Sequence, residues 1–314
     1  MEPDQVSVSA RISAFVRAYH AQHDNPKIFD DYLAIQLFTA EDLALFRSNL
    51  SQALAFFDPE RAAECHDVES ALAAFMRAQS GPITLTRARY AEDVLEAAIA
   101  GGMWQYVILG AGLDTFVYRR GDLMPNLQVF EIDHPATQAF KRRRIAELGW
   151  DEPPHVHYLP VDLVSDNLAA SLAHSGYDPT VPTFISWLGV TYYLDRTVLF
   201  DTLRSLASLA PAGSAIVFDY LDTQAFVPEQ TARRVRLMQE ATRRAGEPMV
   251  TGLDPAALAA DVAPLGLRLV ENLCPADLET RYFANRDDGY HAFEQIHFAH
   301  AVVEQGPEHG LAVQ

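Results

Sequence analysis

A glycine-containing turn directly after an apolar segment constrains the fold of this 314-residue chain more than any other feature. Residues 106–109 are continuously apolar, which is typical of a buried parallel strand, and they run into Gly110-Ala111-Gly112. Glycines at such a turn let the backbone approach a ligand where side chains would collide. Glu131 follows the next apolar segment, at about the 20-residue distance that separates a nucleotide-type glycine turn from a ribose-binding carboxylate. The pattern predicts an adenosine-containing cofactor at the carboxyl edge of a parallel sheet.

The residue at the third position of the turn motif bears on which cofactor binds. The dinucleotide fingerprint G-x-G-x-x-G uses its third glycine for close helix–strand packing, and Thr115 occupies that position here. S-adenosylmethionine has no pyrophosphate, so it needs the tight turn and the ribose acid but not the third glycine. The turn therefore favours S-adenosylmethionine over a nicotinamide dinucleotide, and a purely structural glycine turn is the remaining alternative.

Seven segments in a fixed order along the chain carry a family resemblance. The most specific covers residues 107–115 (VILGAGLDT) and is followed by Tyr118-Arg119. The others are individually short: 24–31 (DNPKIFDD), 86–90 (TRARY), 129–135 (VFEIDHP), 160–163 (PVDL), 187–194 (WLGVTYYL) and 281–283 (RYF). Together they resemble the S-adenosylmethionine-dependent methyltransferases of the leucine carboxyl methyltransferase type, in particular their bacterial relatives, and the resemblance covers roughly residues 10–303.

This resemblance implies roles for the residues on both sides of the first strand. An arginine upstream of that strand pairs with the cofactor's carboxylate in the family, and either Arg87 or Arg89 matches it. A bidentate guanidinium–carboxylate pair is the expected geometry. Gly110 and Gly112 match the turn beneath the methionine part, and Asp114 follows them in the same motif.

The resemblance also implies contacts to the ribose and the adenine. Glu131 and Asp133 match an acidic pair after the second strand, one of which should hold the ribose hydroxyls. Asp162 and Leu163 match the adenine contacts, with a carboxylate facing the exocyclic amine and an apolar side chain on the ring.

One position departs from the family pattern. Many relatives carry a glutamate just before the glycine of the fourth-strand motif, where this chain has Leu188 before Gly189. The substitution removes a polar contact near the cofactor or the acceptor. The predicted cofactor-binding set is Arg87, Arg89, Gly110, Gly112, Asp114, Glu131, Asp133, Asp162, Leu163 and Leu188.

Composition excludes several other classes of protein. A net charge of -18 argues against nucleic-acid binding, because a nucleic-acid binder needs a basic surface. The one basic run, residues 141–144, is interpreted as a solvated helix face. Cys65 and Cys274 are far apart, so the sequence predicts neither a zinc site nor a disulfide framework, and no metal is expected. Residues 1–5 do not resemble a signal peptide, and no apolar stretch is long enough to span a membrane, so we expect a cytoplasmic protein without a membrane role.

The alternation of elements predicts an α/β fold. Residues 6–80 show helical periodicity, with helices expected at 6–20, 40–57 and 59–79 and a break at Gly81-Pro82. Strands are expected at 105–109, 127–132, 155–159, 182–187, 214–220, 267–273 and 296–303, with helices between most of them. The resemblance implies a Rossmann-like class I methyltransferase with a seven-stranded, mostly parallel sheet and an antiparallel last strand. We expect a helical cap over residues 1–82 and a methyltransferase domain over 83–314 with an insertion near 222–262.

Methyl transfer from a sulfonium does not require a catalytic triad, because the protein mainly aligns the acceptor and excludes water. A carboxylate acceptor needs no base, whereas a hydroxyl must lose its proton. Trp187, Tyr192 and Tyr193 leave the fourth strand at the ligand-binding edge and are candidates for an acceptor pocket, although packing in the core would equally explain them.

The predicted function is O-methylation of a carboxylate or hydroxyl of a small molecule, with S-adenosylmethionine as the cofactor. A nicotinamide-dependent oxidoreductase is an alternative, which Thr115 disfavours. A cofactor-binding protein without catalysis is another, which Leu188 keeps open. The sequence does not indicate the oligomeric state.

Overall fold

A computed structural model describes residues 6–304 of the chain. Two expectations lie outside the described residues. One is the pair of outer domain limits at residues 1 and 314, and the other is that residues 1–5 are not a signal peptide. Seven strands form one sheet in the order β3-β2-β1-β4-β5-β7-β6. They are β1 (Gln105–Leu109), β2 (Gln128–Asp133), β3 (Val156–Pro160), β4 (Thr183–Trp187), β5 (Ala215–Leu221), β6 (Leu267–Leu273) and β7 (Ile296–Val303).

The pairing within the sheet agrees with the predicted topology. The strands β3, β2, β1, β4 and β5 are mutually parallel, whereas β7 inserts antiparallel between β5 and β6. The predicted strands match the observed ones to within one residue at each end. Because β1 lies between β2 and β4, the strand order reverses at β1, which is where open α/β sheets bind ligands outside the carboxyl ends of their strands.

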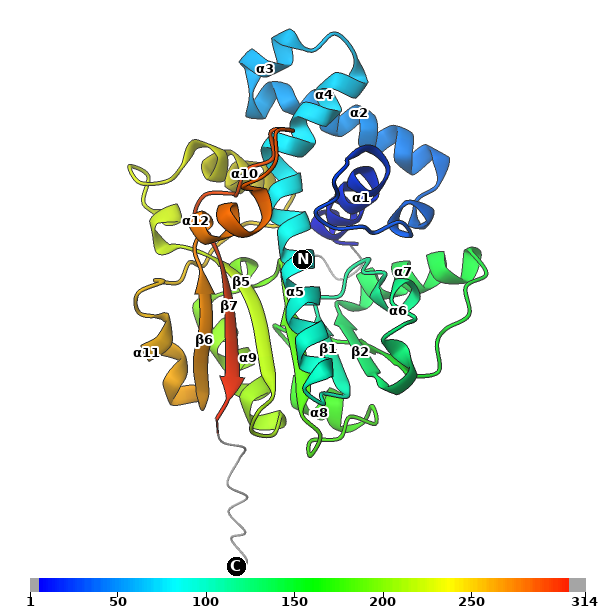
Figure 1. Ribbon diagram of the computed structural model, residues 1–314, viewed down its shortest axis with the longest axis vertical. Coiled ribbons are helices and arrows are strands. Elements are labelled where there is room, and N and C mark those ends of the chain that lie inside the picture. Colours follow the sequence, from blue (N-terminus) through cyan, green and yellow to red (C-terminus); the bar gives the residue numbers. More distant parts are fainter. Residues whose placement is uncertain (1–5, 305–314) are drawn as a thin grey trace, which may run out of the picture.

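Helices cover both faces of the sheet, and further helices lie above the carboxyl ends of its parallel strands (Figure 1). The α-helices are α1 (Val8–His23), α2 (Ala40–Phe57), α3 (Pro59–Glu64), α4 (Val68–Phe75), α5 (Gly81–Ala100), α6 (Phe116–Arg119), α7 (Pro135–Glu147), α8 (Leu168–Ala173), α9 (Arg196–Leu209), α10 (Arg233–Arg244), α11 (Leu258–Val262) and α12 (Pro275–Leu278). Shorter 3-10 or π segments are η1 (Ala34–Leu37), η2 (Met76–Ser80), η3 (Met124–Asn126), η4 (Thr191–Tyr193), η5 (Thr223–Phe226), η6 (Ala263–Leu265) and η7 (Glu279–Phe283).

The alternation of side chains along the central strand divides the core into two halves. Val107 and Leu109 point into a cluster that includes residues of α8, α9 and α11. Tyr106 and Ile108 point to the opposite face, where α5 and α6 pack. All five residues of β1 are buried, as expected for a central parallel strand covered on both sides.

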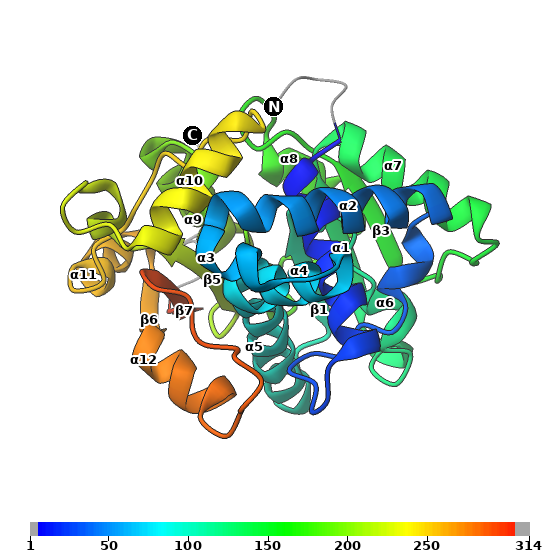
Figure 2. The ribbon, with the colours of Figure 1, turned by 90° about the horizontal axis from the view of Figure 1, so that it is seen from above.

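The helical N-terminal part has its own apolar core above the carboxyl edge of the sheet. Residues of α1, α2 and α4 form this third cluster, and α5 runs from it down along the sheet (Figure 1). Seen from above, α1, α2 and α4 lie across the middle of the sheet, and α10 of the insertion lies beside α2 (Figure 2). The cap thus covers the edge at which a ligand is expected.

The helix break predicted at Gly81-Pro82 is wrong. The helix that starts at Val68 continues through the π segment η2 into α5 and ends at Ala100. Pro82 has no N–H to donate to the Ala78 carbonyl four residues before it, and that carbonyl accepts from the Arg234 guanidinium at 3.0 Å instead. A Cβ at position 81 would overlap the carbonyl oxygen of Met76 and the ring of Tyr290, so only glycine fits there without a shift. The glycine is therefore explained by close packing and not by a turn.

The segment between β5 and β6, called the insertion below, contains η5, α10, α11 and η6. No helix among residues 6–304 is both long enough and apolar enough to cross a membrane.

Candidate functional site

The glycine turn after β1 is held in a conformation that glycine adopts readily. Gly110 has φ 76° and Gly112 has φ 52°, both in the left-handed region. The backbone N–H groups of Gly110 and Ala111 donate to the carbonyl of Ile132, at 2.8 and 3.1 Å, and thereby tie the turn to the end of β2. A Cβ on Gly110 would overlap the Cγ2 atom of Val190. Packing against the segment after β4 therefore adds to the backbone constraint.

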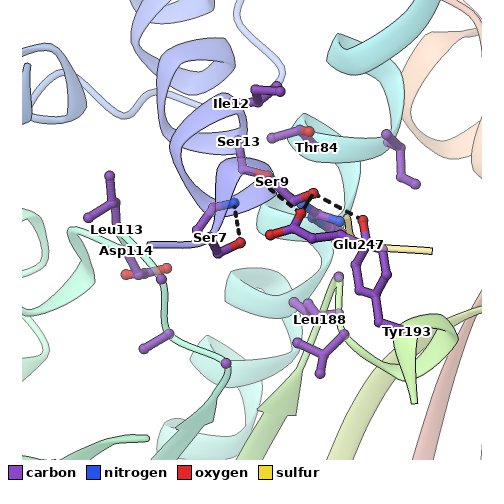
Figure 3. A pocket seen from close by; sticks show the side chains of 18 of the residues that line it. Ser7, Ser9, Ile12, Ser13, Thr84, Leu113, Asp114, Leu188, Tyr193 and Glu247 are labelled. Atoms are coloured by element: carbon purple, nitrogen blue, oxygen red, sulfur yellow. Dashed lines mark hydrogen bonds between the residues drawn. The ribbon is translucent and has the colours of Figure 1, made fainter. Parts of the chain in front are cut away.

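A half-open cavity of about 730 Å³ extends from this turn into the space beneath the cap. Its size lies in the range usual for a small-molecule site. Figure 3 shows Ser9 and Ser13 on α1 facing Leu188 and Tyr193 on the sheet side, with Asp114 at the glycine turn. The sheet edge, the cap and the insertion all contribute to this cavity, so segments distant in sequence form one site.

The cavity distinguishes the two candidate arginines. Arg87 lines it; its guanidinium donates to the Tyr192 hydroxyl at 3.1 Å and to the Ser13 hydroxyl at 2.7 Å. Arg89 does not line the cavity, because it lies on the outer side of α5 and pairs with Asp93 at 2.6 Å. Only Arg87 is therefore placed to meet a cofactor.

Of the two acidic residues on β2, only Asp133 reaches the cavity. Asp133 lies at the end of the strand and lines the cavity; its carboxylate accepts hydrogen bonds from the N–H groups of Gly112 and His134. Burial raises the pKa of Asp133, and these two N–H groups oppose that effect. Glu131, two residues deeper, does not line the cavity and forms a buried ion pair with Lys141.

Only part of the basic run at residues 141–144 faces solvent. Lys141 is 1% exposed and is committed to Glu131, whereas Arg142 and Arg143 are exposed. The prediction of a solvated face is wrong for Lys141, since the helical period turns this one position of the run toward β2.

The remaining cofactor candidates lie where the resemblance implies. Asp162 and Leu163 follow β3 and line the cavity, as do Asp114, beside the glycine turn, and Leu188, directly after β4. Leu188 is half-buried, so the position that carries glutamate in many relatives presents an apolar side chain here.

Of the three aromatic candidates, two lie at the cavity. Trp187 is fully buried in the core and does not line the cavity, so the alternative of core packing holds for it. Tyr192 and Tyr193 both line the cavity. The Tyr193 hydroxyl lies 3.2 Å from the Ser9 hydroxyl of α1, which connects the segment after β4 to the cap.

Two acidic residues at or beside the site, Asp219 and Glu247, belong to no recognised motif. Asp219 of β5 is fully buried, accepts from the N–H of Gly189 at 2.6 Å, and lies 3.8 Å from the Arg87 guanidinium. Glu247 of the insertion accepts a 2.5 Å hydrogen bond from the Ser9 hydroxyl and also accepts from the N–H groups of Val8 and Ser9, both at 3.1 Å. An acid at a helix N-terminus is favoured by the helix dipole. A pattern within one segment could not reveal these contacts.

Within residues 6–304, no three His, Cys, Asp or Glu side chains gather as they would around a metal ion, and both cysteines are free.

Comparisons with known proteins agree with this arrangement. A family model described as leucine carboxyl methyltransferase matches residues 10–207. The Bacillus subtilis (strain 168) protein YktD, provisionally named an S-adenosyl-L-methionine-dependent methyltransferase, is 39% identical over 303 residues, covering 96% of this chain and 99% of YktD. A Mycobacterium ulcerans protein with a similar provisional name is 31% identical over 242 residues, covering 76% of this chain and 73% of that protein.

Two crystal structures show the same fold. One is a protein from Thermobifida fusca, provisionally described as a methyltransferase, with a TM-score of 0.57 and 16% identity over 97% of each chain. The other is a DUF574-family protein from Streptomyces avermitilis, with a TM-score of 0.55 and 17% identity over 94% of this chain and 97% of that one. These matches confirm the predicted Rossmann-like α/β class. The chain therefore belongs to the leucine carboxyl methyltransferase family of S-adenosylmethionine-dependent methyltransferases.

Proposed function

We propose that this protein transfers a methyl group from S-adenosylmethionine to an oxygen atom, a carboxylate or a hydroxyl, of a small-molecule acceptor. The observation that carries the proposal is the continuity of the cavity, which joins the glycine turn and Asp133 at the sheet edge to the space beneath the cap. One continuous cavity lets a cofactor and an acceptor lie next to each other.

The residues along the sheet edge fit the cofactor. Asp133 presents a carboxylate to the ribose hydroxyls beside the turn, and Asp162 and Leu163 offer a carboxylate and an apolar surface to the adenine. Arg87 presents a guanidinium to the carboxylate of the methionine part, and the hydroxyls of Tyr192 and Ser13 fix its orientation. The excess of acidic groups along the cavity favours a cationic sulfonium.

When bound, the cofactor supplies a methyl group on a positively charged sulfur, which is already a good leaving group. The chain's own residues then have to orient the acceptor and exclude water. Leu188 and side chains of α1 and α5 line the cavity and would contribute to both tasks.

The experiment that tests this function is methyl transfer from S-adenosylmethionine labelled in the methyl group to a panel of small phenols, alcohols, carboxylic acids, amines and thiols. Mass spectrometry of the products should place the label on oxygen. Label found only on nitrogen, sulfur or carbon would contradict O-methylation while leaving the methyltransferase class intact.

A further inference from the structure

The charges around the cavity are unequal in number and in availability. Among the described residues that line it, five carboxylates (Glu92, Asp114, Asp133, Asp162 and Glu247) face two guanidinium groups (Arg17 and Arg87), and no lysine is present. An anionic acceptor entering this space needs a cationic partner, because burying an unpaired carboxylate costs several kcal/mol.

Neither guanidinium is available for an acceptor. Arg17 is 8% exposed and donates to the Asp31 carboxylate at 2.8 Å and to the Leu113 carbonyl at 2.8 Å. Arg87 is held by Tyr192 and Ser13, and in the function proposed above it binds the cofactor's own carboxylate. Apart from the sulfonium of the cofactor itself, a second carboxylate in the same cavity would therefore find no free cationic side chain to pair with among the lining residues.

The cap and the insertion contribute several apolar side chains to the cavity beside their polar ones. Ile12, Leu50, Phe57, Phe75, Met238 and Met249 line it, and they come from α1, α2, α4, α10 and the loop that follows α10. Methionine and aromatic side chains of this kind suit a flexible or aromatic hydrocarbon body.

One carboxylate lies between these apolar side chains and the sheet edge. Glu247 accepts from the Ser9 hydroxyl at 2.5 Å, and that hydroxyl lies 3.2 Å from the Tyr193 hydroxyl (Figure 3). The other four lining carboxylates differ in place or commitment: Asp114, Asp133 and Asp162 follow strand ends at the cofactor side, and Glu92 is paired with Arg119 and Arg120. Burial raises the pKa of Tyr193 to about 12, so near neutral pH its hydroxyl stays protonated, can donate a hydrogen bond and does not act as a base.

We propose that the acceptor is an uncharged, largely apolar compound methylated on a hydroxyl group, and that the hydroxyl proton leaves through Ser9 to Glu247. This inference rests on the proposed function and narrows it by excluding a carboxylate acceptor. In the step, the acceptor oxygen forms a bond to the methyl carbon as the carbon–sulfur bond breaks, and the electron pair of that bond stays on sulfur as a neutral thioether. The hydroxyl proton passes to the Ser9 oxygen as the proton of Ser9 passes to the Glu247 carboxylate, which becomes neutral.

A matched pair of probes tests the charge argument through binding alone. 4-Butylphenol and 4-butylbenzoic acid have similar shapes, but only the second is an anion at pH 8. Calorimetric titration into the complex with S-adenosylhomocysteine should show the phenol binding at least tenfold more tightly at pH 8. The difference should shrink as the pH is lowered and the acid becomes neutral. Equal or tighter binding of the benzoate at pH 8, or no binding of either probe, would overturn the inference.

Variants test the proton route. Glu247→Gln keeps an oxygen that can accept from the N–H groups at the start of α1 but cannot take a proton, and Ser9→Ala keeps those N–H groups but removes the hydroxyl. For methylation of 4-butylphenol, each variant should lower kcat by about 10²-fold, the usual contribution of a general base. The dissociation constant for S-adenosylhomocysteine should stay within about threefold of wild type. Glu229→Gln, at an exposed position of the same insertion, is the matched control.

The outcomes separate this inference from the function on which it rests. Methylation of 4-butylbenzoic acid but not of 4-butylphenol would overturn the inference and support O-methylation. Label on nitrogen, sulfur or carbon acceptors alone would overturn both. Wild-type kcat in both variants, with the phenol as substrate, would overturn the proton route.

Discussion

At the scale of single residues, the site depends on backbone conformation and on the depth of each charge. A glycine at position 110 could be needed because a side chain would enter ligand space. The structure gives another reason: the backbone is left-handed, and a Cβ would overlap Val190. Likewise, Glu131 and Asp133 share a strand and a charge but lie at different depths, and only Asp133 reaches the cavity.

Replacing Gly110 by Ala should therefore lower the stability of the protein itself. A non-glycine residue in the left-handed region costs about 1–2 kcal/mol before the contact with Val190 is counted. Urea unfolding should show at least this loss, and calorimetry should show weaker binding of S-adenosylhomocysteine because the turn must shift. Gly121→Ala, at an exposed position with open space around the new Cβ, is the control. Equal stability of the two variants would contradict the account.

Asp133→Ala should weaken binding of S-adenosylhomocysteine by about 1–3 kcal/mol, which is the usual cost of losing a hydrogen bond to a buried charged group. Glu131→Gln should change this affinity little, since Glu131 does not line the cavity. Calorimetric titration of both variants decides the matter. A larger loss in Glu131→Gln, measured on protein shown to be folded, would place the ribose elsewhere.

At the scale of elements, the strands were predictable, whereas the helices between residues 59 and 100 were not. The helix expected at 59–79 is interrupted between Glu64 and Val68, and the break expected at Gly81-Pro82 does not occur. The strands lie within one residue of their predicted limits, because each is a short, buried apolar run. The continuous helix from Val68 to Ala100 was missed, because Gly81-Pro82 ordinarily marks a break. What permits continuity is the π segment and the closeness of Tyr290, a residue far away in sequence.

Gly81→Ala tests the close packing of this helix, because we expect it to lower the stability, whereas helix propensity alone predicts that it raises it. In an exposed helix the change would stabilise by about 1 kcal/mol. Here the new Cβ would overlap the Met76 carbonyl oxygen and the Tyr290 ring, and crowding of this kind in a packed core costs about 1–3 kcal/mol. We expect a net loss of stability in urea unfolding, and a stabilised variant would show that the helices pack less closely than described.

At the scale of the whole molecule, the cap, the sheet edge and the insertion meet in one cavity. The resemblance predicts which cavity residues would hold the cofactor, because these residues lie at or just after strand ends in recognisable motifs. The contacts of Glu247 with Ser9 could not be predicted, since 238 residues separate them and neither lies in a motif. The acceptor half therefore becomes visible only in three dimensions.

The buried pair of Glu131 and Lys141 should give the unfolding free energy a distinctive pH dependence. Burial raises the pKa of Glu131 from 4.5 to about 7, with Lys141 opposing the shift. Between these two values the folded protein binds more protons at this site than the unfolded chain does. The contribution of Glu131 to stability is therefore fully present below about pH 4.5 and is lost as the pH rises through 7.

Urea unfolding at pH 5 and pH 8 measures this effect. The wild type should lose more stability between the two values than the double variant Glu131→Gln/Lys141→Met, in which the site no longer titrates. A smaller pH dependence in the wild type than in the double variant would contradict the assignment.

The most direct test of the central claim is calorimetric titration of the purified protein with S-adenosylmethionine, S-adenosylhomocysteine and NAD in parallel. Micromolar binding of both sulfur compounds and no binding of NAD is the predicted result, with the affinity for S-adenosylhomocysteine reduced in Asp133→Ala. Binding of NAD alone would contradict the assignment of the cavity to a methyltransferase cofactor.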